Sequence, residues 1–128
     1  ISGEWKGISA GGCPNHPATY PNNPKFLVTL ESTRTMGCDN SLLVFLKGPK
    51  QYSLGMKVTC VKLDDETMTA PFKTKDSGAY RSGFVVLELD SLPSGTFEIT
   101  PSTFSPQQEG PFFLEFKSSC SITVTRVR

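Results

Sequence analysis

The sequence predicts an all-β protein, an eight-stranded antiparallel β-sandwich. Segments rich in Val, Ile, Phe and Thr recur along the whole chain, as expected for strands. Several of these segments alternate apolar and polar residues, which is typical of a sheet with one buried face. Gly and Pro separate them, and no segment combines a helical apolar period with helix caps. Two packed antiparallel layers are the simplest architecture for such a pattern.

The expected strands follow one another from the first residues to the last. Those near the end alternate most clearly, as in Phe97-Glu98-Ile99 and Ile122-Thr123-Val124. Turn-forming residues interrupt the pattern, as in Pro93-Ser94-Gly95. In chain order, the expected strands are Glu4–Ser9, Lys25–Leu30, Ser41–Leu46, Met56–Leu63, Phe84–Leu89, Gly95–Thr100, Pro111–Lys117 and Ser121–Val127.

The composition fits one globular domain and excludes several functional classes. The chain has 128 residues, of which 37% are hydrophobic and 20% charged, and one packed core suits this size. No apolar run approaches the length that crosses a bilayer. The formal net charge is +1, whereas a nucleic-acid binder needs concentrated positive charge to neutralise phosphates. We therefore expect no nucleic-acid partner.

The four cysteines predict free thiols rather than disulfides or a zinc site. Cys13, Cys38, Cys60 and Cys120 are dispersed without a C-x-x-C pair, and the chain has one histidine, His16. Disulfide frameworks are typical of smaller, cysteine-dense secreted domains, and structural zinc needs clustered ligands. We expect mostly buried thiols in a reducing, intracellular compartment.

Cys13 and His16 lie close in the sequence, but they do not indicate a catalytic pair. A thiol nucleophile needs a base, an orienting group and an environment that lowers its pKa, such as a helix N-terminus. The segment Cys13-Pro14-Asn15-His16-Pro17 is instead a loop bracketed by prolines. Catalytic groups of this kind are normally assembled from distant chain positions. No residue of this chain is therefore assigned a catalytic role.

Two blocks, one near each end, place Trp, Gly, Asn and Pro in a distinctive order. The first runs from Trp5 to Cys13 as WKGISAGGC and is closed by Asn23-Pro24-Lys25-Phe26. The second runs from Leu92 to Phe104 as LPSGTFEITPSTF and is followed by Gly110-Pro111-Phe112-Phe113-Leu114. In order and spacing these blocks resemble domain III of the calpains, a C2-like β-sandwich that follows the protease core. The resemblance brackets nearly the whole chain.

The resemblance implies a C2-like fold and a non-catalytic role. Residues 1–128 would form one domain of a larger calpain-type cysteine protease, whose catalytic Cys, His and Asn lie elsewhere. The absence of a calcium-binding helix-loop-helix sequence after Ser121–Val127 is similar to atypical calpains without EF-hands. The implied partners are the protease core, a neighbouring C2-like domain, another protein or an anionic membrane, in the cytoplasm or the nucleus.

Two other functional classes remain open at the level of sequence. A stand-alone lipid-binding C2 module would adsorb to anionic membranes in a salt-sensitive way. An extracellular adhesion-type β-sandwich would contain paired cysteines. A count of free thiols separates the second class from the calpain-type interpretation.

Asp64, Asp65 and Glu66 are the candidate calcium ligands. Calcium requires several oxygens that converge on one point. The family's acidic loop corresponds here to residues 31–39, which hold two acids and one Arg. The other loop acids are Asp39, Asp76 and Asp90. Because this supply is small, we expect a solvated loop without a metal or cofactor, and a calcium site is the alternative.

Basic residues outnumber acidic ones between Ser41 and Gly83. C2 folds often bind acidic head groups on a lysine-bearing sheet face, and the candidate partner or lipid surface is Lys47, Lys50, Lys57 and Lys62. In a regular strand Lys57 and Lys62 would point to opposite faces, because their spacing is odd. The alternative is that these lysines are scattered and keep the domain soluble.

Trp5, Gly11, Gly12, Asn23 and Pro24 are the residues of the predicted structural motif. We expect the Trp5 indole to cover one end of the core, with its N–H bonded to a loop carbonyl. The two glycines allow positive φ angles in the loop that follows. The functional alternative is that the loop from Gly11 to Pro24 docks a neighbouring domain.

Overall fold

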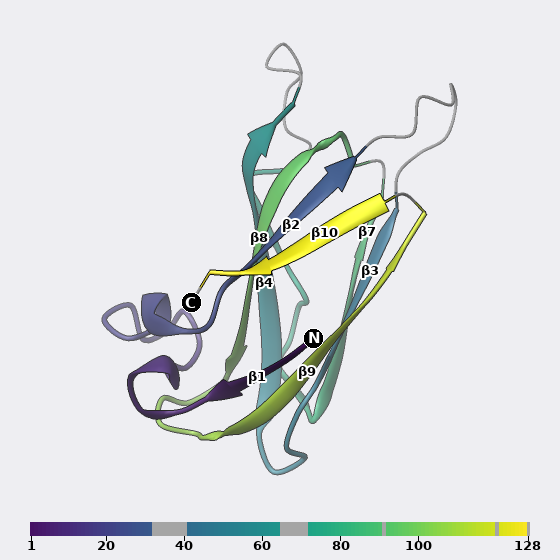
Figure 1. Cartoon of the computed structure of the whole chain (residues 1–128). Coiled ribbons are helices and arrows are strands. Elements are labelled where there is room, and N and C mark those ends of the chain that lie inside the picture. Colours follow the sequence, from purple (N-terminus) through teal and green to yellow (C-terminus); the bar gives the residue numbers. More distant parts are fainter. Residues whose placement is uncertain (32–40, 65–71, 91, 120, 128) are drawn as a thin grey trace.

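Two antiparallel β-sheets packed face to face form the molecule (Figure 1). The computed structural model describes residues 1–31, 41–64, 72–90, 92–119 and 121–127. One sheet has four strands in the order β1-β9-β3-β7, and the other has six, in the order β10-β2-β8-β4-β5 with β6 paired to β4. The predicted all-β sandwich is confirmed.

The strand bounds agree with the sequence prediction to within a few residues for most elements. The four-stranded sheet contains β1 (Ser2–Trp5), β9 (Gly110–Ser118), β3 (Leu42–Lys47) and β7 (Phe84–Leu89). The six-stranded sheet contains β10 (Ser121–Arg126), β2 (Phe26–Glu31), β8 (Gly95–Thr103), β4 (Ser53–Leu63), β5 (Thr74–Asp76) and β6 (Arg81–Ser82).

Two features differ from the prediction. The first expected strand, Glu4–Ser9, ends early at Trp5, and Gly7–Ser9 forms a 3-10 turn, η1. Gly7 has a φ of +56°, which is incompatible with an extended strand. The described residues also contain two strands that were not predicted, β5 and β6, which are too short and too exposed to show an alternation. A second 3-10 turn, η2, covers Tyr20–Asn22.

The core lies between the sheets and is rich in aromatic residues. The Trp5 ring lies 4.5 Å from that of Phe112, which in turn meets Phe26 edge to face at 6.0 Å. The Trp5 indole N–H donates to the carbonyl of Pro101 at 3.2 Å. This acceptor belongs to β8 rather than to a loop, so the indole fixes β1 of one sheet to a central strand of the other.

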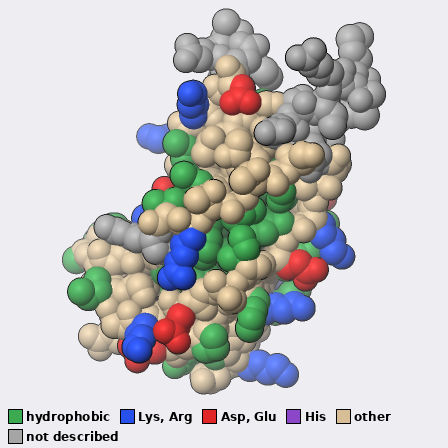
Figure 2. Space-filling view, viewed as in Figure 1, with side chains coloured by type: hydrophobic (Ala, Val, Ile, Leu, Met, Phe, Trp, Pro, Cys, Tyr) green, Lys and Arg blue, Asp and Glu red, His purple; other side chains and the backbone are tan. Residues whose placement is uncertain are grey.

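The open side of the sandwich faces the viewer in Figure 2. Hydrophobic side chains gather there in a band between β10 and β9. Phe116, Ile122 and Val124 from these two strands are partly buried and pack against the core. Among the described residues, no helix is long and apolar enough to cross a membrane.

Candidate interaction surfaces

Asn23 organises the loop between β1 and β2. Its side chain is fully buried, and its Oδ1 accepts a hydrogen bond from the Gly11 N–H at 3.0 Å. Its Nδ2 donates to the carbonyls of Gly12 at 2.8 Å and Tyr20 at 2.9 Å. One amide therefore satisfies three backbone groups and ties the start of the loop to its end. Pro24, which follows, is also buried.

The two glycines of the loop leave no room for a side chain. A Cβ on Gly11 would collide with the carbonyl oxygen of Thr19. The Thr19 hydroxyl donates to the Gly11 carbonyl at 2.7 Å, which holds the two segments together. Gly12 has a φ of +76°, and a Cβ there would lie 2.6 Å from the nitrogen of Pro106.

The loop also binds the connection between β8 and β9. The backbone N–H of Cys13 donates to the carbonyl of Phe104 at 3.1 Å, and that of Gln107 donates to Ala10 at 2.8 Å. The Gly7 N–H donates to the carboxylate of Glu109 at 2.6 Å. The two sequence blocks that resemble calpain domain III therefore contact each other in space.

Two tyrosines cover polar residues on the outer face of the six-stranded sheet. The Tyr80 hydroxyl lies 2.7 Å from Oγ of Ser102, which is fully buried although it points away from the core. Tyr20, from η2, lies over Thr100. Burial raises the pKa of both tyrosines above the ordinary value of 10.0, and for Tyr20 the nearby Glu98 adds to this effect.

Lys57 and Lys62 share the outer face of the six-stranded sheet, contrary to the expectation for a regular strand. The register of β4 against β8 shifts between Cys60 and Lys62, which leaves one extra residue in β4. Lys57 pairs with Thr100, and Lys62 pairs with Thr96, so both follow the same alternate set of β8. The predicted split between two faces is therefore wrong, because it assumed an unbroken strand.

This face carries charges of both signs. The Lys57 ammonium lies 5.6 Å from the centre of the Tyr20 ring and faces Asp76 across the pairing of β4 with β5. Glu98 lies on the same face and forms an ion pair of 3.9 Å with Lys25. Acidic groups thus accompany the lysines.

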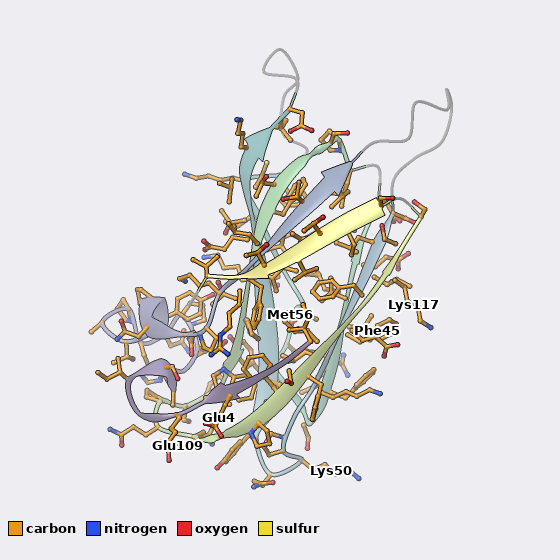
Figure 3. The ribbon with its side chains drawn as sticks, in the orientation of Figure 1. Glu4, Phe45, Lys50, Met56, Glu109 and Lys117 are labelled. Atoms are coloured by element: carbon orange, nitrogen blue, oxygen red, sulfur yellow. The ribbon has the colours of Figure 1, made fainter. Side chains whose placement is uncertain are left out.

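Lys47 and Lys50 lie elsewhere. Lys47 is exposed on β3 of the four-stranded sheet. Lys50 is exposed in the connection from β3 to β4, at the bottom of the view in Figure 3. The four candidate lysines therefore do not form one continuous patch.

The candidate calcium ligands are only partly described. Asp64 is exposed directly after β4, whereas Asp65, Glu66 and Asp39 lie outside the described residues. Asp76 and Asp90 are exposed. Within the described ranges, no group of three or more His, Cys, Asp and Glu side chains lies close enough to hold a metal ion.

Cys13 and His16 share a backbone turn, in which the His16 N–H donates to the Cys13 carbonyl at 3.0 Å. Cys13 is a free thiol, only 2% exposed, beneath a cavity of about 570 Å³ that Tyr80 and Phe104 also line. Cys60 is a free, half-buried thiol. Cys38 and Cys120 lie outside the described residues.

The outer face of the four-stranded sheet carries an exposed apolar patch, which we call the aromatic face. Its members project outward because the residues that alternate with them are buried in β3, β7 and β9. The aromatic face consists of Leu43, Phe45, Phe84, Val86 and Phe113. Phe113 is 56% exposed, Phe84 43% and Val86 39%. Figure 3 shows Phe45 on the outside of this sheet, whereas Met56 lies between the sheets.

Strand pairing and ring stacking join three residues of the aromatic face, Phe45, Val86 and Phe84. Phe45 is paired with Val86 on one side and with Glu115 on the other, and its ring stacks on that of Phe84 at 6.1 Å. The Lys117 ammonium lies 5.5 Å from the Phe45 ring centre. Figure 3 shows Lys117 beside Phe45.

Charges of both signs are interspersed with the aromatic face. Lys47 lies between Phe84 and Phe113, and Leu43 lies between Glu88 and Lys117. A hollow of about 510 Å³ adjoins one end of this face. It is lined by Lys47, Gly48, Pro49, Gln51, Pro111 and Phe113.

Comparison with known protein families identifies the family of this chain. Residues 1–116 match the family described as calpain large subunit, domain III. The chain belongs to this family. The resemblance inferred from the two terminal blocks is confirmed, and the match also covers the interval between them.

Individual calpains agree with this assignment of the domain III chain. Calpain-7 of Homo sapiens is 46% identical over 128 residues, which is 100% of this chain and 15% of that protein. Calpain-7 of Mus musculus is 44% identical with the same coverage. The calpain-1 catalytic subunit of Bos taurus is 33% identical to this chain. The match covers 93% of this chain and 21% of that protein. The domain III chain thus spans a small part of its relatives.

Among solved structures, the P-domain of Macrobrachium rosenbergii nodavirus covers 94% of the domain III chain at 10% identity. Its TM-score is 0.22, a likeness too low to bear on the fold.

The aromatic face was missed in the sequence of this domain III chain, although a signal was present. Leu42–Leu46, Phe84–Leu87 and Phe112–Leu114 are uninterrupted apolar runs, not alternating ones. Such runs indicate strands with two apolar faces. The three runs belong to β3, β7 and β9, which are neighbours in one sheet.

Proposed function

We propose that this chain is a non-catalytic domain of a calpain-type intracellular cysteine protease and acts through contacts with other domains of the parent protein. One observation carries the proposal. The chain matches domain III over residues 1–116, yet it covers only 15% of the calpain-7 sequences to which it is similar. A folded unit with those proportions would be one module among several of a parent protein. Its contribution would be to position or regulate a protease core, or to recruit that core to a partner.

The local geometry of Cys13 supports a non-catalytic role. Its thiol is buried, and its backbone is held by hydrogen bonds to both Phe104 and His16. A nucleophile needs a base within hydrogen-bond reach and access for the substrate. A turn that is fixed by these hydrogen bonds has a structural role instead.

The internal contacts of the sandwich support a role in which the domain docks to a partner. Asn23, Gly11 and Gly12 fasten the long first loop, and the Trp5 indole joins the two sheets. These contacts hold the first loop and the two sheets in fixed positions. The exposed apolar residues on the four-stranded sheet then offer a contact area to a partner.

The proposal is tested first on the isolated chain. The 128-residue chain should not cleave a fluorogenic peptide or an unfolded protein. Turnover that disappears in Cys13→Ala but persists in Cys60→Ala would contradict the non-catalytic role. The second test compares the intact parent protein with a variant that lacks the domain. We expect a severalfold change in peptidase activity or in intracellular distribution, and an unchanged protease would overturn the regulatory role.

Binding to anionic membranes is the second candidate function. The observation in its favour is the register shift in β4, which places Lys57 and Lys62 on one face. Asp76, Glu98 and the Tyr20 ring on the same face weaken the attraction to phosphates.

This candidate is tested by co-sedimentation with anionic liposomes at low and physiological salt, with calcium or a chelator. Loss of binding in Lys57→Glu, but not in the matched variant Lys47→Glu on the other sheet, would support it. Absence of binding under all conditions would remove it and would favour the docking role. Binding that requires calcium would indicate that the sparse acids do form a site.

A further inference from the structure

We propose that the aromatic face of the four-stranded sheet docks against another folded domain of the same polypeptide. This inference rests on the proposed function, and it names the surface and the kind of partner. The partner would present an apolar side chain that enters the hollow beside Phe113, and a carboxylate that pairs with Lys47.

The exposure of these residues is unusual for an antiparallel sheet. Such sheets normally bury one face and present polar residues on the other. Here Phe113, Phe84 and Val86 are all well exposed. Phe45 joins Val86 by strand pairing and Phe84 by stacking, and Phe113 lies on the other side of Lys47 from Phe84. Scattered apolar residues need no explanation, whereas the largest contiguous apolar patch of a protein is often a functional surface.

The size of the patch favours a tethered partner over a second copy. The nine outward residues of three neighbouring strands, namely the five of the aromatic face and the four charged residues among them, cover roughly 300 Å² at ordinary strand spacings. A stable complex between free proteins typically buries about 800 Å² on each partner. Interfaces between domains of one chain begin at about 300 Å² a side, because the linker keeps the local concentration high.

The charges on and beside the aromatic face define what can dock. Two lysines and two glutamates are interspersed with the apolar residues: Lys47, Lys117, Glu88 and Glu115. Lys117 is already engaged with the Phe45 ring, whereas Lys47 lies between Phe84 and Phe113 and also lines the hollow. A carboxylate of the partner would pair with Lys47, and an apolar side chain next to it would fill the hollow of about 510 Å³.

The comparisons support a partner within the same polypeptide. The chain covers 15% of the calpain-7 sequences. By that proportion most of the parent polypeptide lies outside this domain and is joined to it covalently. A neighbouring domain is therefore always present at high effective concentration, which suits a face of this area.

The direct test is hydroxyl-radical footprinting of the aromatic side chains. Labelling of Phe84 and Phe113 is compared between the isolated chain and the intact parent protein. We expect these two side chains to be labelled about tenfold more slowly in the parent. This is the expected factor if the face is docked about nine-tenths of the time. Val61 is the internal control, since it is 54% exposed on the six-stranded sheet and should label equally in both proteins. Equal labelling of Phe113 in both proteins would overturn the inference.

A charge-insertion pair tests the mechanism. In the intact parent, Phe113→Glu should restore the labelling of Phe84 to its rate in the isolated chain, whereas Val61→Glu should leave Phe84 protected. Thermal unfolding of both variants as isolated chains checks that each remains folded. Continued protection of Phe84 in a folded Phe113→Glu parent would contradict the proposed contact.

Two further measurements separate the alternatives. Sedimentation equilibrium of the isolated chain should give a monomer, and a dimer that Phe113→Glu dissociates would assign the face to a second copy instead. Peptidase activity of the parent is recorded in parallel. An inactive parent would refute the protease assignment and leave the footprint interpretable, whereas an unprotected face in an active parent would refute this inference alone.

Discussion

The two outer faces of the sandwich differ in how they meet solvent. On the six-stranded sheet, polar residues such as Thr100 and Ser102 point outward but are buried beneath Tyr20 and Tyr80. On the four-stranded sheet, apolar residues such as Phe84 and Phe113 point outward and remain exposed. The chain thus covers part of its polar face with its own tyrosines and leaves apolar residues of the other face exposed.

This difference separates a region that the chain covers itself from a region that it leaves exposed to solvent. The covered face is closed by segments of the chain itself, since the first loop contributes Tyr20 and the segment before β6 contributes Tyr80. The aromatic face, by contrast, presents rings to solvent in the isolated chain. Burial of those rings by a partner would release apolar surface from water, which is the main driving force of association.

Adjacent phenylalanines in β9 give the largest contrast. Phe112 is fully buried between the sheets, and Phe113 is more than half exposed. We expect Phe112→Ala to lower the free energy of unfolding by about 4 kcal/mol, because it leaves a cavity in the core. Phe113→Ala should change it by no more than about 0.5 kcal/mol. Urea titration of both variants measures this, and a large loss in Phe113→Ala would show that the aromatic face stabilises the isolated fold.

Removal of the Asn23 amide should have the next largest effect. Asn23→Ala leaves the Gly11 N–H and the carbonyls of Gly12 and Tyr20 without their partner. We expect a loss of about 3 kcal/mol in the free energy of unfolding, measured by denaturant titration. The control is Asn15→Ala, an exposed position in the same loop, for which about 0.5 kcal/mol or less is expected. Equal losses in the two variants would mean that the hydrogen bonds of Asn23 are not the cause.

Substitution of the loop glycines should have an intermediate effect. Gly12→Ala combines a φ of +76° with a collision against Pro106, and we expect a loss of about 2 kcal/mol. Gly7→Ala has a φ of +56° but open space around the new methyl group, so about 1 kcal/mol is expected. Thermal unfolding compares the two variants. A larger loss at Gly7 would show that the contact with Pro106 relaxes without cost.

The smallest effect is a change in the pH dependence of stability. Because burial raises the pKa of Tyr80 above 10.0, the folded state keeps this proton more tightly than the unfolded state does. The stabilisation is complete below pH 10 and is lost as the pH rises above 10 toward the folded-state pKa. Tyr80→Phe should therefore flatten the decline in unfolding free energy above pH 10. An identical slope in the wild-type chain would show that Tyr80 does not contribute.

Local sequence patterns predicted much of the fold. Alternating apolar residues such as Phe97 and Ile99 correctly predicted strands, and these residues are buried in the structure. The prediction works because the alternation of side chains along a strand is a local property of the sequence. The order of Trp5, Gly11, Gly12, Asn23 and Pro24 indicated the family and the shape of the first loop. The hydrogen bonds of Asn23 now explain why an amide and two glycines occur there. Short exposed strands such as β5 gave no local signal, since their residues form no buried face.

The surfaces were decided by tertiary structure. One extra residue in β4 moved Lys62 to the face of Lys57, which the count of residues alone could not reveal. The aromatic face formed because β3, β7 and β9, far apart in the sequence, became neighbours in one sheet. The sequence by itself determined the strand content, the structural loop and the family, because these depend on local periodicity and on backbone conformation. Only the tertiary structure decided which side chains share a surface, because that depends on strand order and register between distant segments.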